Sequence, residues 1–178
     1  MSTRRRFEHP NHVRFLTFSC FQRLPLLSNP RIADAFASHL AAMRDRLGFH
    51  LHAWVVMPEH VHLLLWPRVG ACDVPRILRA IKQPIAQQVL RRWTSVRATV
   101  LEKVVDGTGQ PRFWQRGGGF DRNVFSEEEL AEKFAYIHNN QVHRGLCTRP
   151  EDWRWSSARW YLGHREGEIR MDPLSRPQ

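Results

Sequence analysis

The sequence predicts an α+β fold with one mainly antiparallel β-sheet and helices packed on one face. Three observations lead to this prediction. Segments rich in β-branched and aromatic residues alternate with segments whose apolar residues recur at helical spacing. Two predicted strands follow each other directly across a short turn, as antiparallel neighbours do. The order strand, helix, strand, strand, helix, strand, helix contains two βαβ-like halves, which is typical of a ferredoxin-like sandwich.

The first half of the chain supplies four of these elements. Residues 12–21, HVRFLTFSCF, predict a strand because strand-forming residues dominate and face alternate sides. The turn-prone stretch LPLLSNP leads to a helix over residues 31–49, which Gly48 is expected to end. Residues 50–57 and 60–66 predict two strands, and Pro58 between them could not join a central ladder.

The second half supplies two helices and a short strand. Residues 73–93 predict a helix capped by Asp73, which Pro84 is expected to kink or divide. Residues 104–125 contain turn signals, a triple glycine and a short aromatic strand, and residues 126–145 begin with a capping box and end at a glycine. We therefore predict a single domain over residues 1–165 and a polar tail over 166–178.

Charge points to the class of partner. The chain of 178 residues has 27 Lys+Arg against 17 Asp+Glu, a net charge of +10. Such a field favours polyanions, with nucleic acid the first candidate and an acidic membrane surface the second. No run of 18 apolar residues occurs, no apolar stretch follows the N-terminus, and the three cysteines are scattered. We expect a cytoplasmic protein with no membrane partner, no disulfide framework and no zinc site of cysteines.

Two histidines in the predicted strand 60–66 are the first candidate site residues. His60 and His62 point to the same side of the strand as Leu64 and Trp66, because side chains alternate. Two imidazoles about 7 Å apart along a strand can converge on one divalent cation. The alternative is a pair of histidines satisfied by hydrogen bonds at a sheet edge, and the pattern HxH alone does not decide between the two.

The capped helix offers the residues that would complete such a site. Tyr136 and Asn140 lie one turn apart on a flank of an apolar stripe, so both can face the same neighbour. The side-chain carbonyl of Asn140 could be an oxygen ligand, with the phenol of Tyr136 beside it. Taken singly, Tyr136 is typical of a half-buried helix aromatic and Asn140 of an exposed helix residue. The combination with a paired-histidine strand favours a site.

A tyrosine beside a metal suits cleavage of a phosphodiester. The metal would polarise a non-bridging oxygen, and the phenolate would keep the 5′-phosphate as a covalent phosphotyrosine. Because a phenol loses its proton only near about pH 10, a cation or a base must assist. His138 and His143 are candidate proton acceptors, and a surface location is the alternative for each.

Three motifs carry a resemblance to a known family. The three motifs are MPEHVHLLL, YIHNNQVHRGL and DWRWSSARWY, and the stretches FLTFSCFQRLPLL and FWQRGGGFDRNVFSEEEL fit the same pattern. In these segments the chain resembles the HUH single-tyrosine transposases of small insertion sequences. The nearest branch is that of the REP-associated tyrosine transposases of bacteria, and the resemblance covers residues 10–163. It implies that His60, His62 and Asn140 bind the metal and that Tyr136 is the nucleophile.

The resemblance also implies cofactor, substrate and assembly. The family uses Mg²⁺ or Mn²⁺ and no small-molecule cofactor, acts on single-stranded DNA, and recognises hairpins beside a short tetranucleotide. A monomer or a homodimer is implied. Two positions depart from the pattern: Gln141 follows Asn140 where proline is usual, and Glu59 stands where asparagine is common.

Further residues are candidates for DNA contact. The run Arg4, Arg5 and Arg6 could meet the hairpin foot or the tetranucleotide, or it could be a solvated tail. Around the triple glycine, a base could stack with phosphate contacts nearby, and a flexible surface loop is the alternative. The residues proposed there are Arg112, Trp114, Arg116 and Arg122. We expect Trp153, Trp155 and Trp160 to pack as core or as a lid.

The sequence therefore predicts a metal-dependent DNA strand-transferase and nickase that acts at hairpin sites through Tyr136. The alternative is a hairpin-DNA binding protein of the same fold without chemistry. An RNA-binding module of ferredoxin-like fold is disfavoured, because histidines occupy the face on which such a module exposes aromatic residues.

Overall fold

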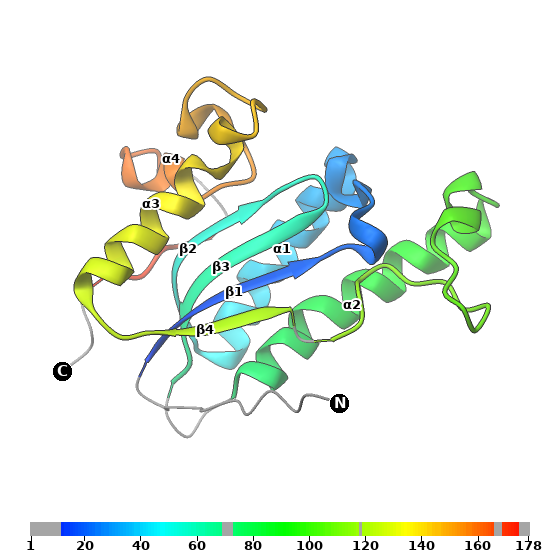
Figure 1. Cartoon of the computed structure of the whole chain (residues 1–178), viewed down its shortest axis with the longest axis horizontal. Helices are drawn as coiled ribbons and strands as arrows, with labels where there is room; N and C mark the ends of the chain where they lie inside the picture. Colours follow the sequence, from blue (N-terminus) through cyan, green and yellow to red (C-terminus); the bar gives the residue numbers. More distant parts are fainter. Residues whose placement is uncertain (1–11, 69–72, 118, 166–168, 175–178) are drawn as a thin grey trace.

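The computed structural model describes residues 12–68, 73–117, 119–165 and 169–174. A four-stranded sheet of order β2-β3-β1-β4 forms its centre, and every neighbouring pair is antiparallel (Figure 1). The strands are β1 (Val13–Ser19), β2 (His50–Val56), β3 (His60–Trp66) and β4 (Phe120–Val124). The predicted α+β fold is confirmed.

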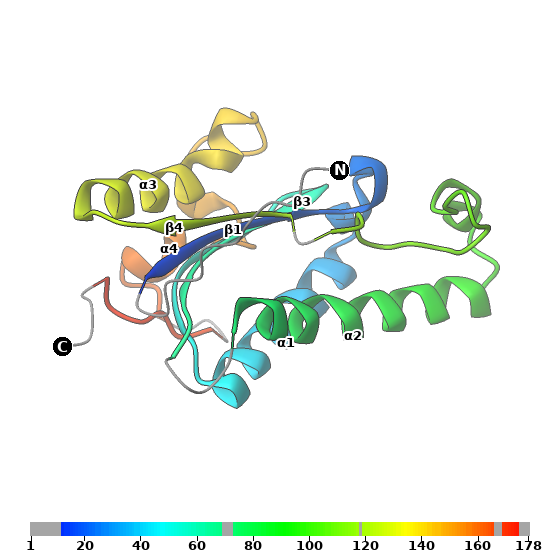
Figure 2. The same ribbon diagram turned by 60° about the horizontal axis from the view of Figure 1, so that its bottom comes forward.

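The helices cover both faces of this sheet. The longer ones are α1 (Pro30–Leu47), α2 (Val74–Ser95) and α3 (Glu127–His143). Figure 2 shows α1 and α2 on one side of the sheet and α3 on the other, which differs from the expectation of helices on one face only. The short helices are Phe21–Arg23, Leu26–Ser28, Thr99–Lys103, Pro150–Asp152 and α4 (Ala158–Tyr161). No helix among the described residues is long and apolar enough to span a bilayer.

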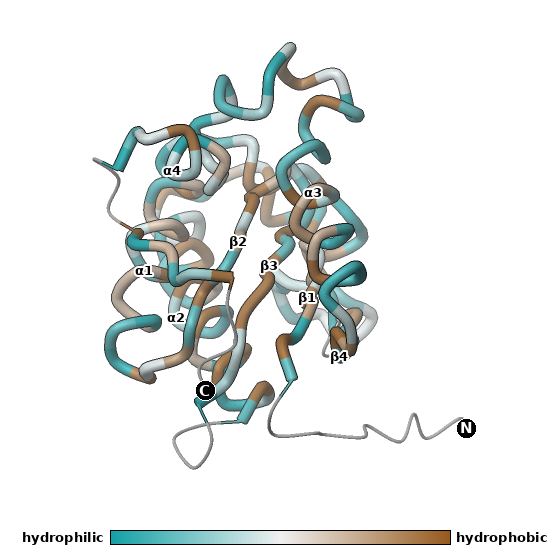
Figure 3. Tube along the Cα trace, turned by 90° about the vertical axis from the view of Figure 1, so that its left-hand side faces the viewer, coloured by the Kyte–Doolittle hydropathy of each residue, from teal (hydrophilic) through white to brown (hydrophobic). Residues whose placement is uncertain are grey.

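Alternation along β1 divides the core into two layers. Leu16 and Phe18 are buried among the side chains of α1 and α2, whereas Val13 and Phe15 are buried with residues of α3. Figure 3 shows the apolar stretches of the strands between these two helical layers. Because each strand is covered on both faces, β2 and β3 consist almost entirely of buried residues. A polar side chain on the α3 side of the sheet is therefore enclosed.

Local signals set the ends of α1 and α3. The Asn29 side chain accepts from the Arg31 N–H at the start of α1, and Gly48 ends that helix at φ 67°. Ser126 accepts from the Glu129 N–H, as the capping box predicts. After α3, the Leu146 N–H donates to Gln141 O and the Gly145 N–H to Val142 O, which is a Schellman ending.

Pro84 does not divide α2, so of the two outcomes expected there, a kink or a division, the division does not occur. The helix runs without interruption from Val74 to Ser95. A proline cannot donate to the carbonyl four residues before it, and here that carbonyl, Ala80 O, accepts from His39 Nε2 of α1 at 2.8 Å. The tertiary contact replaces the lost helical bond, so the helix continues.

Part of the predicted tail packs on the folded domain. Ile169 and Met171 are buried in the core layer of α1 and α2. Asp172 accepts from the Leu51 N–H at 2.8 Å and binds the guanidinium of Arg44. Residues 169–174 thus hold the start of β2 to α1.

Candidate active site

The two histidines of β3 lie on the face of the sheet that α3 covers. Both side chains are buried, with 4% of each exposed. Their Nε2 atoms are 2.9 Å apart, and the ring centroids are separated by 4.6 Å. The alternation predicted for the strand is present, since Val61, Leu63 and Leu65 point to the opposite core layer.

An oxygen atom faces the other nitrogen of each imidazole. His60 Nδ1 lies 3.1 Å from Glu59 Oε1, and His62 Nδ1 lies 2.7 Å from Thr17 Oγ1. A carboxylate only accepts, so His60 Nδ1 carries a proton and its Nε2 a lone pair. The Thr17 hydroxyl can accept from His62 Nδ1 in the same way, and in that tautomer a second lone pair points to the same place. Two lone pairs at 2.9 Å repel unless a cation or a proton lies between them, and this geometry suits a metal ion.

Burial keeps both imidazoles in the form that binds metals. Burial lowers the pKa of His62 to about 3. Burial also lowers the pKa of His60, although the neighbouring Glu59 carboxylate opposes the shift. The neutral imidazole is the metal ligand. Both rings are therefore ready to coordinate at neutral pH.

Asn140 of α3 completes the set from the other side. Its side chain is buried, and Nδ2 lies 3.3 Å from His62 Nε2. Its Oδ1 is buried and has no hydrogen-bond partner among the described residues. A buried acceptor left alone is costly, and a half-turn of the carboxamide exchanges oxygen and nitrogen. An oxygen ligand for a cation is thus available beside the two imidazoles, so the residues fit the metal that the sequence predicts.

Tyr136 lies one turn before Asn140, beside the same histidine. Its ring centroid is 5.3 Å from that of His62 and 5.9 Å from that of Phe15. The side chain is 44% exposed, so solvent and a ligand reach the phenol. The structure therefore brings together all four residues predicted for the chemistry, two from β3 and two from α3.

Gln141, which stands where the resembling family has proline, fixes the end of α3. Its side chain is buried, and Nε2 donates to His138 O at 2.6 Å and to Pro150 O at 3.1 Å. These bonds tie the last turn of α3 to the following segment. Asn140 is consequently held in a well-anchored turn without the proline.

Sequence reasoning missed two positioning contacts. Thr17 stands opposite His62 in the β1–β3 register, and cross-strand partners share a face. Arg144 Nη1 lies 2.9 Å from Glu59 Oε1, which neutralises the carboxylate that orients His60. The alternation of β1 could have found Thr17, because it places that residue on the face of Phe15. No sequence signal pairs Arg144 with Glu59.

The arginines predicted to contact DNA have different surroundings in the structure. Arg4, Arg5 and Arg6 lie outside the described residues. Arg112 and Arg116 both bind the carboxylate of Asp106. Arg122 pairs with Phe15 in the β1–β4 register and so lies on the face of Tyr136, where its guanidinium binds Glu129.

Trp114 belongs to the core, which corrects the expectation of a stacking surface. Only 8% of the side chain is exposed. Its ring packs edge-on against Phe18 and Phe113, and its indole N–H donates to Lys82 O at 2.8 Å. A nucleobase would have to break this packing to stack on the ring.

The two extra histidines of the α3 region differ in their surroundings. His138 is buried and bonded to Ser157 Oγ at 2.7 Å, so the expected surface location is wrong for this residue. Burial lowers its pKa to about 4. His143 is exposed, as expected.

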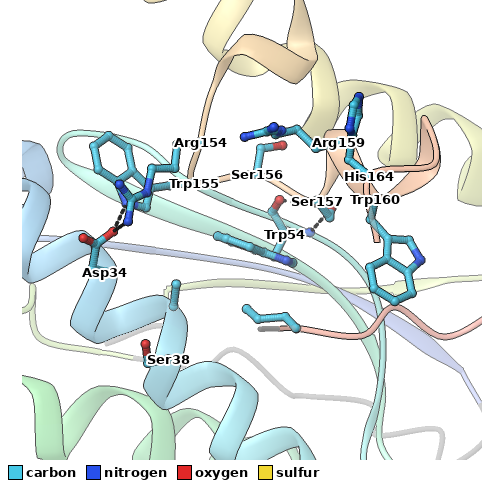
Figure 4. A pocket seen from close by; sticks show the side chains of 12 residues that line it. Asp34, Ser38, Trp54, Arg154, Trp155, Ser156, Ser157, Arg159, Trp160 and His164 are labelled. Atoms are coloured by element: carbon cyan, nitrogen blue, oxygen red, sulfur yellow. Dashed lines mark hydrogen bonds and ion pairs between the residues drawn. The ribbon is translucent and has the colours of Figure 1, made fainter. Parts of the chain in front are cut away.

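The tryptophan-rich segment covers the edge of β2. Trp153 donates its indole N–H to Val56 O, and Trp155 donates to Asp34 Oδ1. Trp54, Trp155 and Trp160 line a pocket of about 440 Å³ (Figure 4). Neither Tyr136 nor the paired histidines contribute to this pocket. The structural role predicted for these tryptophans agrees with their packing.

Comparisons with known proteins identify the family of the chain. Residues 11–140 match the family model described as IS200-like transposase, a span that runs from the start of β1 to Asn140. The chain belongs to the IS200-like transposase family. Membership in this family confirms the resemblance that three sequence motifs carry.

Two members of the wider group show the relation in more detail. The chain is 26% identical over 157 residues to the REP-associated tyrosine transposase of Escherichia coli (strain K12), which is 88% of this chain and 82% of that protein. It also superposes on a REP-associated tyrosine transposase solved in complex with a REP hairpin. The TM-score is 0.67 at 18% identity, over 98% of this chain and 94% of the other. The second likeness shows the shared transposase fold.

Proposed function

We propose that this family member nicks and rejoins single-stranded DNA beside hairpins, with Tyr136 as the nucleophile and a divalent cation as cofactor. One observation carries the proposal. Two imidazole lone pairs and an unpartnered carboxamide oxygen meet beside an accessible phenol, in a chain that belongs to a transposase family. A purely structural histidine pair needs neither the orphan oxygen nor the exposed tyrosine.

His60, His62 and Asn140 would hold the cation. Two nitrogen donors and one oxygen donor leave further coordination positions for water and phosphate oxygens, which suits Mn²⁺ and Mg²⁺. Among the described residues no three His, Cys, Asp or Glu side chains form a cation site. The unpartnered carboxamide oxygen of Asn140 supports this residue as the third donor. When bound, the cation supplies a Lewis acid that stabilises charge on a phosphate oxygen.

The reaction at Tyr136 is a transesterification of the phosphodiester. The exposed phenol releases its proton to water as its oxygen attacks the scissile phosphorus, and the bond from phosphorus to the 3′ oxygen breaks. The 3′ oxygen leaves with the bonding electrons and takes up a proton, while the 5′-phosphate remains on Tyr136. Attack by a 3′-hydroxyl on this phosphotyrosine reverses the step and joins the strands.

Charge and exposure support a DNA substrate. The net charge of +10 favours a polyanion. Tyr136 and Phe120 give the site an exposed phenol and an exposed aromatic ring, and Arg122 lies on the same face, bound to Glu129 with 54% of its side chain exposed. Such a mixture suits unpaired nucleotides, whose bases stack and whose phosphates pair with guanidinium groups. We propose a hairpin beside the cleaved strand because a solved relative of this fold binds one.

The test uses the two tyrosines of the chain. A labelled single-stranded hairpin oligonucleotide is incubated with the protein and Mn²⁺, and the covalent adduct is measured after denaturation. We expect the wild type and Tyr161→Phe to form the adduct and Tyr136→Phe to form none. Tyr161 is the matched control because its phenol donates to His52 O at 2.5 Å, away from the histidine pair.

The outcomes separate the proposal from its rival. An adduct that persists in Tyr136→Phe contradicts the assignment of the nucleophile. Tight hairpin binding without any adduct, across a panel of hairpins and metals, supports a DNA-binding protein without chemistry. A duplex of the same sequence should be cleaved little, because its bases are not free to enter the site.

A further inference from the structure

Helix α2 presents a row of hydrogen-bond donors to solvent. Its 22 residues contain five Arg or Lys side chains and no Asp or Glu. One side of the helix is buried against the sheet and α1, and the opposite side carries exposed residues at three- and four-residue spacing. This outer row, called here the α2 donor row, consists of Arg76, Arg79, Gln83, Gln87 and Arg91.

The charges of the donor row are not balanced within the protein. Among the described residues, no carboxylate forms an ion pair with Arg76, Arg79 or Arg91. Elsewhere arginines do have such partners, as Arg44 has Asp172 and Arg122 has Glu129. Like charges three residues apart on a helix repel each other. An external anion would remove this cost.

A groove along the flank of the donor row adds a half-buried lysine. The groove has a volume of about 440 Å³, is lined by α2 and residues 111–117, and contains no carboxylate in its lining. Lys82 Nζ lies 3.4 Å from Gly117 O and 5.3 Å from the centroid of the Phe18 ring. Burial lowers the pKa of Lys82. An ammonium group without a counter-ion in such a place is suited to an anion that the protein itself does not supply.

We propose that the α2 donor row and the Lys82 groove bind the sugar–phosphate backbone of a DNA duplex stem. The identity of the DNA rests on the proposed function. From Arg76 to Arg91 the helix spans about 22 Å, and every side chain of the row can donate hydrogen bonds. No aromatic side chain belongs to the row, so unpaired bases would find no stacking surface there. Regular phosphates of a duplex match a straight row of donors.

The fold connects this surface to the phenol on the other side of the sheet. Figure 2 shows α2 and α3 on opposite faces, with β4 at the edge of the sheet. Gly117 contacts Lys82, and three residues later Phe120 pairs with Thr17 on the face of the histidines. Phe120 is 45% exposed, and its ring centroid is 6.1 Å from that of Phe15. A strand that leaves the stem at the groove can therefore pass over Phe120 to Tyr136.

The test measures how binding of a hairpin depends on salt. All proteins carry Tyr136→Phe, so the measurement needs no cleavage and a failure of the proposed chemistry is a separate result. The test variant replaces Arg76, Arg79 and Arg91 by Gln. The control variant replaces Arg31, Arg46 and Arg159 by Gln, which removes the same charge from exposed arginines outside α2. Fluorescence anisotropy gives the affinity for a labelled hairpin at salt concentrations between about 0.05 and 0.3 M, a range over which counterion release changes the affinity strongly.

We expect the test variant to lose affinity and salt dependence together. Each phosphate contact contributes about 0.9 to the slope of log K against log salt, so three lost contacts lower the slope by about 2 to 3. At about 0.15 M salt the affinity should fall by roughly ten- to a hundredfold, with a smaller loss in the control. Equal losses in the two variants would show a general charge effect and overturn the proposal. An equal loss for a single strand of the same length would assign the row to unpaired DNA and also overturn it.

Lys82→Met tests the groove separately. Methionine keeps the bulk of the side chain and removes the charge, so the slope should fall by about 1 while the melting temperature is unchanged or rises. An unchanged slope with a lower melting temperature would show that Lys82 serves the packing against Phe18 alone, and it would remove the groove from the DNA surface.

Discussion

Two side-chain oxygen atoms orient the histidines of the site. Glu59 and Thr17 each face an Nδ1 atom, at 3.1 and 2.7 Å, and leave the Nε2 atoms to face each other. Partners of this kind fix the tautomer and the orientation of a ligand imidazole. The carboxylate does so for His60 with the help of Arg144, and the hydroxyl does so for His62. The metal binding proposed for the pair thus depends on residues other than the proposed ligands themselves.

Thr17→Val tests this dependence at a single residue. Valine has the shape of threonine and suits a strand, but it leaves His62 Nδ1 without its partner. We expect about 10- to 100-fold weaker Mn²⁺ binding, measured by calorimetry, with a matching rise in the Mn²⁺ concentration needed for adduct formation. Thr17→Ser keeps the hydroxyl and should stay within a fewfold of wild type. Equal Mn²⁺ affinity in Val and Ser variants would show that the hydroxyl does not orient the ring.

At the scale of elements, the entry into β4 depends on one glycine. Gly119 has φ +77°, and a Cβ atom there would lie 2.0 Å from the Thr17 carbonyl oxygen of β1. Gly117 also has positive φ, +94°, but a Cβ atom there would meet nothing within 4 Å. The two glycines therefore share the backbone requirement and differ in the space around them.

Alanine at the two positions should separate strain from collision. Gly117→Ala is expected to lower the free energy of unfolding by about 1 kcal/mol, from the left-handed backbone alone. Gly119→Ala should cost more than about 2 kcal/mol, because the strand must also move away from Thr17. Urea denaturation measures both. Equal losses would mean that β4 shifts freely relative to β1.

The ends of the helices could be predicted from local sequence, but the continuity of α2 could not. The caps at Asp73 and Ser126 follow from residue type and spacing, and both side chains make the expected bonds. The continuity of α2 through Pro84 could not be predicted, because the replacement donor is His39 on another helix. A contact from another helix thus replaces the hydrogen bond that Pro84 cannot make within α2.

At the scale of the whole molecule, buried neutral histidines tie stability to pH. The pKa of His138 is about 4 in the folded protein, against about 6.5 for an unperturbed histidine. Since the unfolded chain binds the proton more readily, the contribution of this histidine to the free energy of unfolding is fully present above about pH 6.5. It is lost as the pH drops towards 4. Burial acts in the same direction on His52, His60 and His62.

His138→Gln isolates one of these contributions. Glutamine does not titrate and can still bond Ser157 Oγ. We expect the loss of unfolding free energy between about pH 7.5 and 4.5 to be smaller by about 2 kcal/mol than in wild type, measured by urea denaturation at both values. His143→Gln, a change at an exposed position, should leave the wild-type pH dependence in place. A pH dependence unaltered by His138→Gln would show that other groups carry the acid sensitivity.

The sequence by itself determined the fold class, the strand face that carries both imidazoles, and the one-turn spacing of Tyr136 and Asn140. These properties are local, because alternation, helical repeat and capping depend on neighbours within a few residues. Only the tertiary structure decided that α3 crosses the second face of the sheet. That crossing brings Asn140 to 3.3 Å from His62, 78 residues earlier in the chain. Trp114 and His138 are likewise buried by contacts with distant segments, and such burial depends on how the rest of the chain packs against a residue.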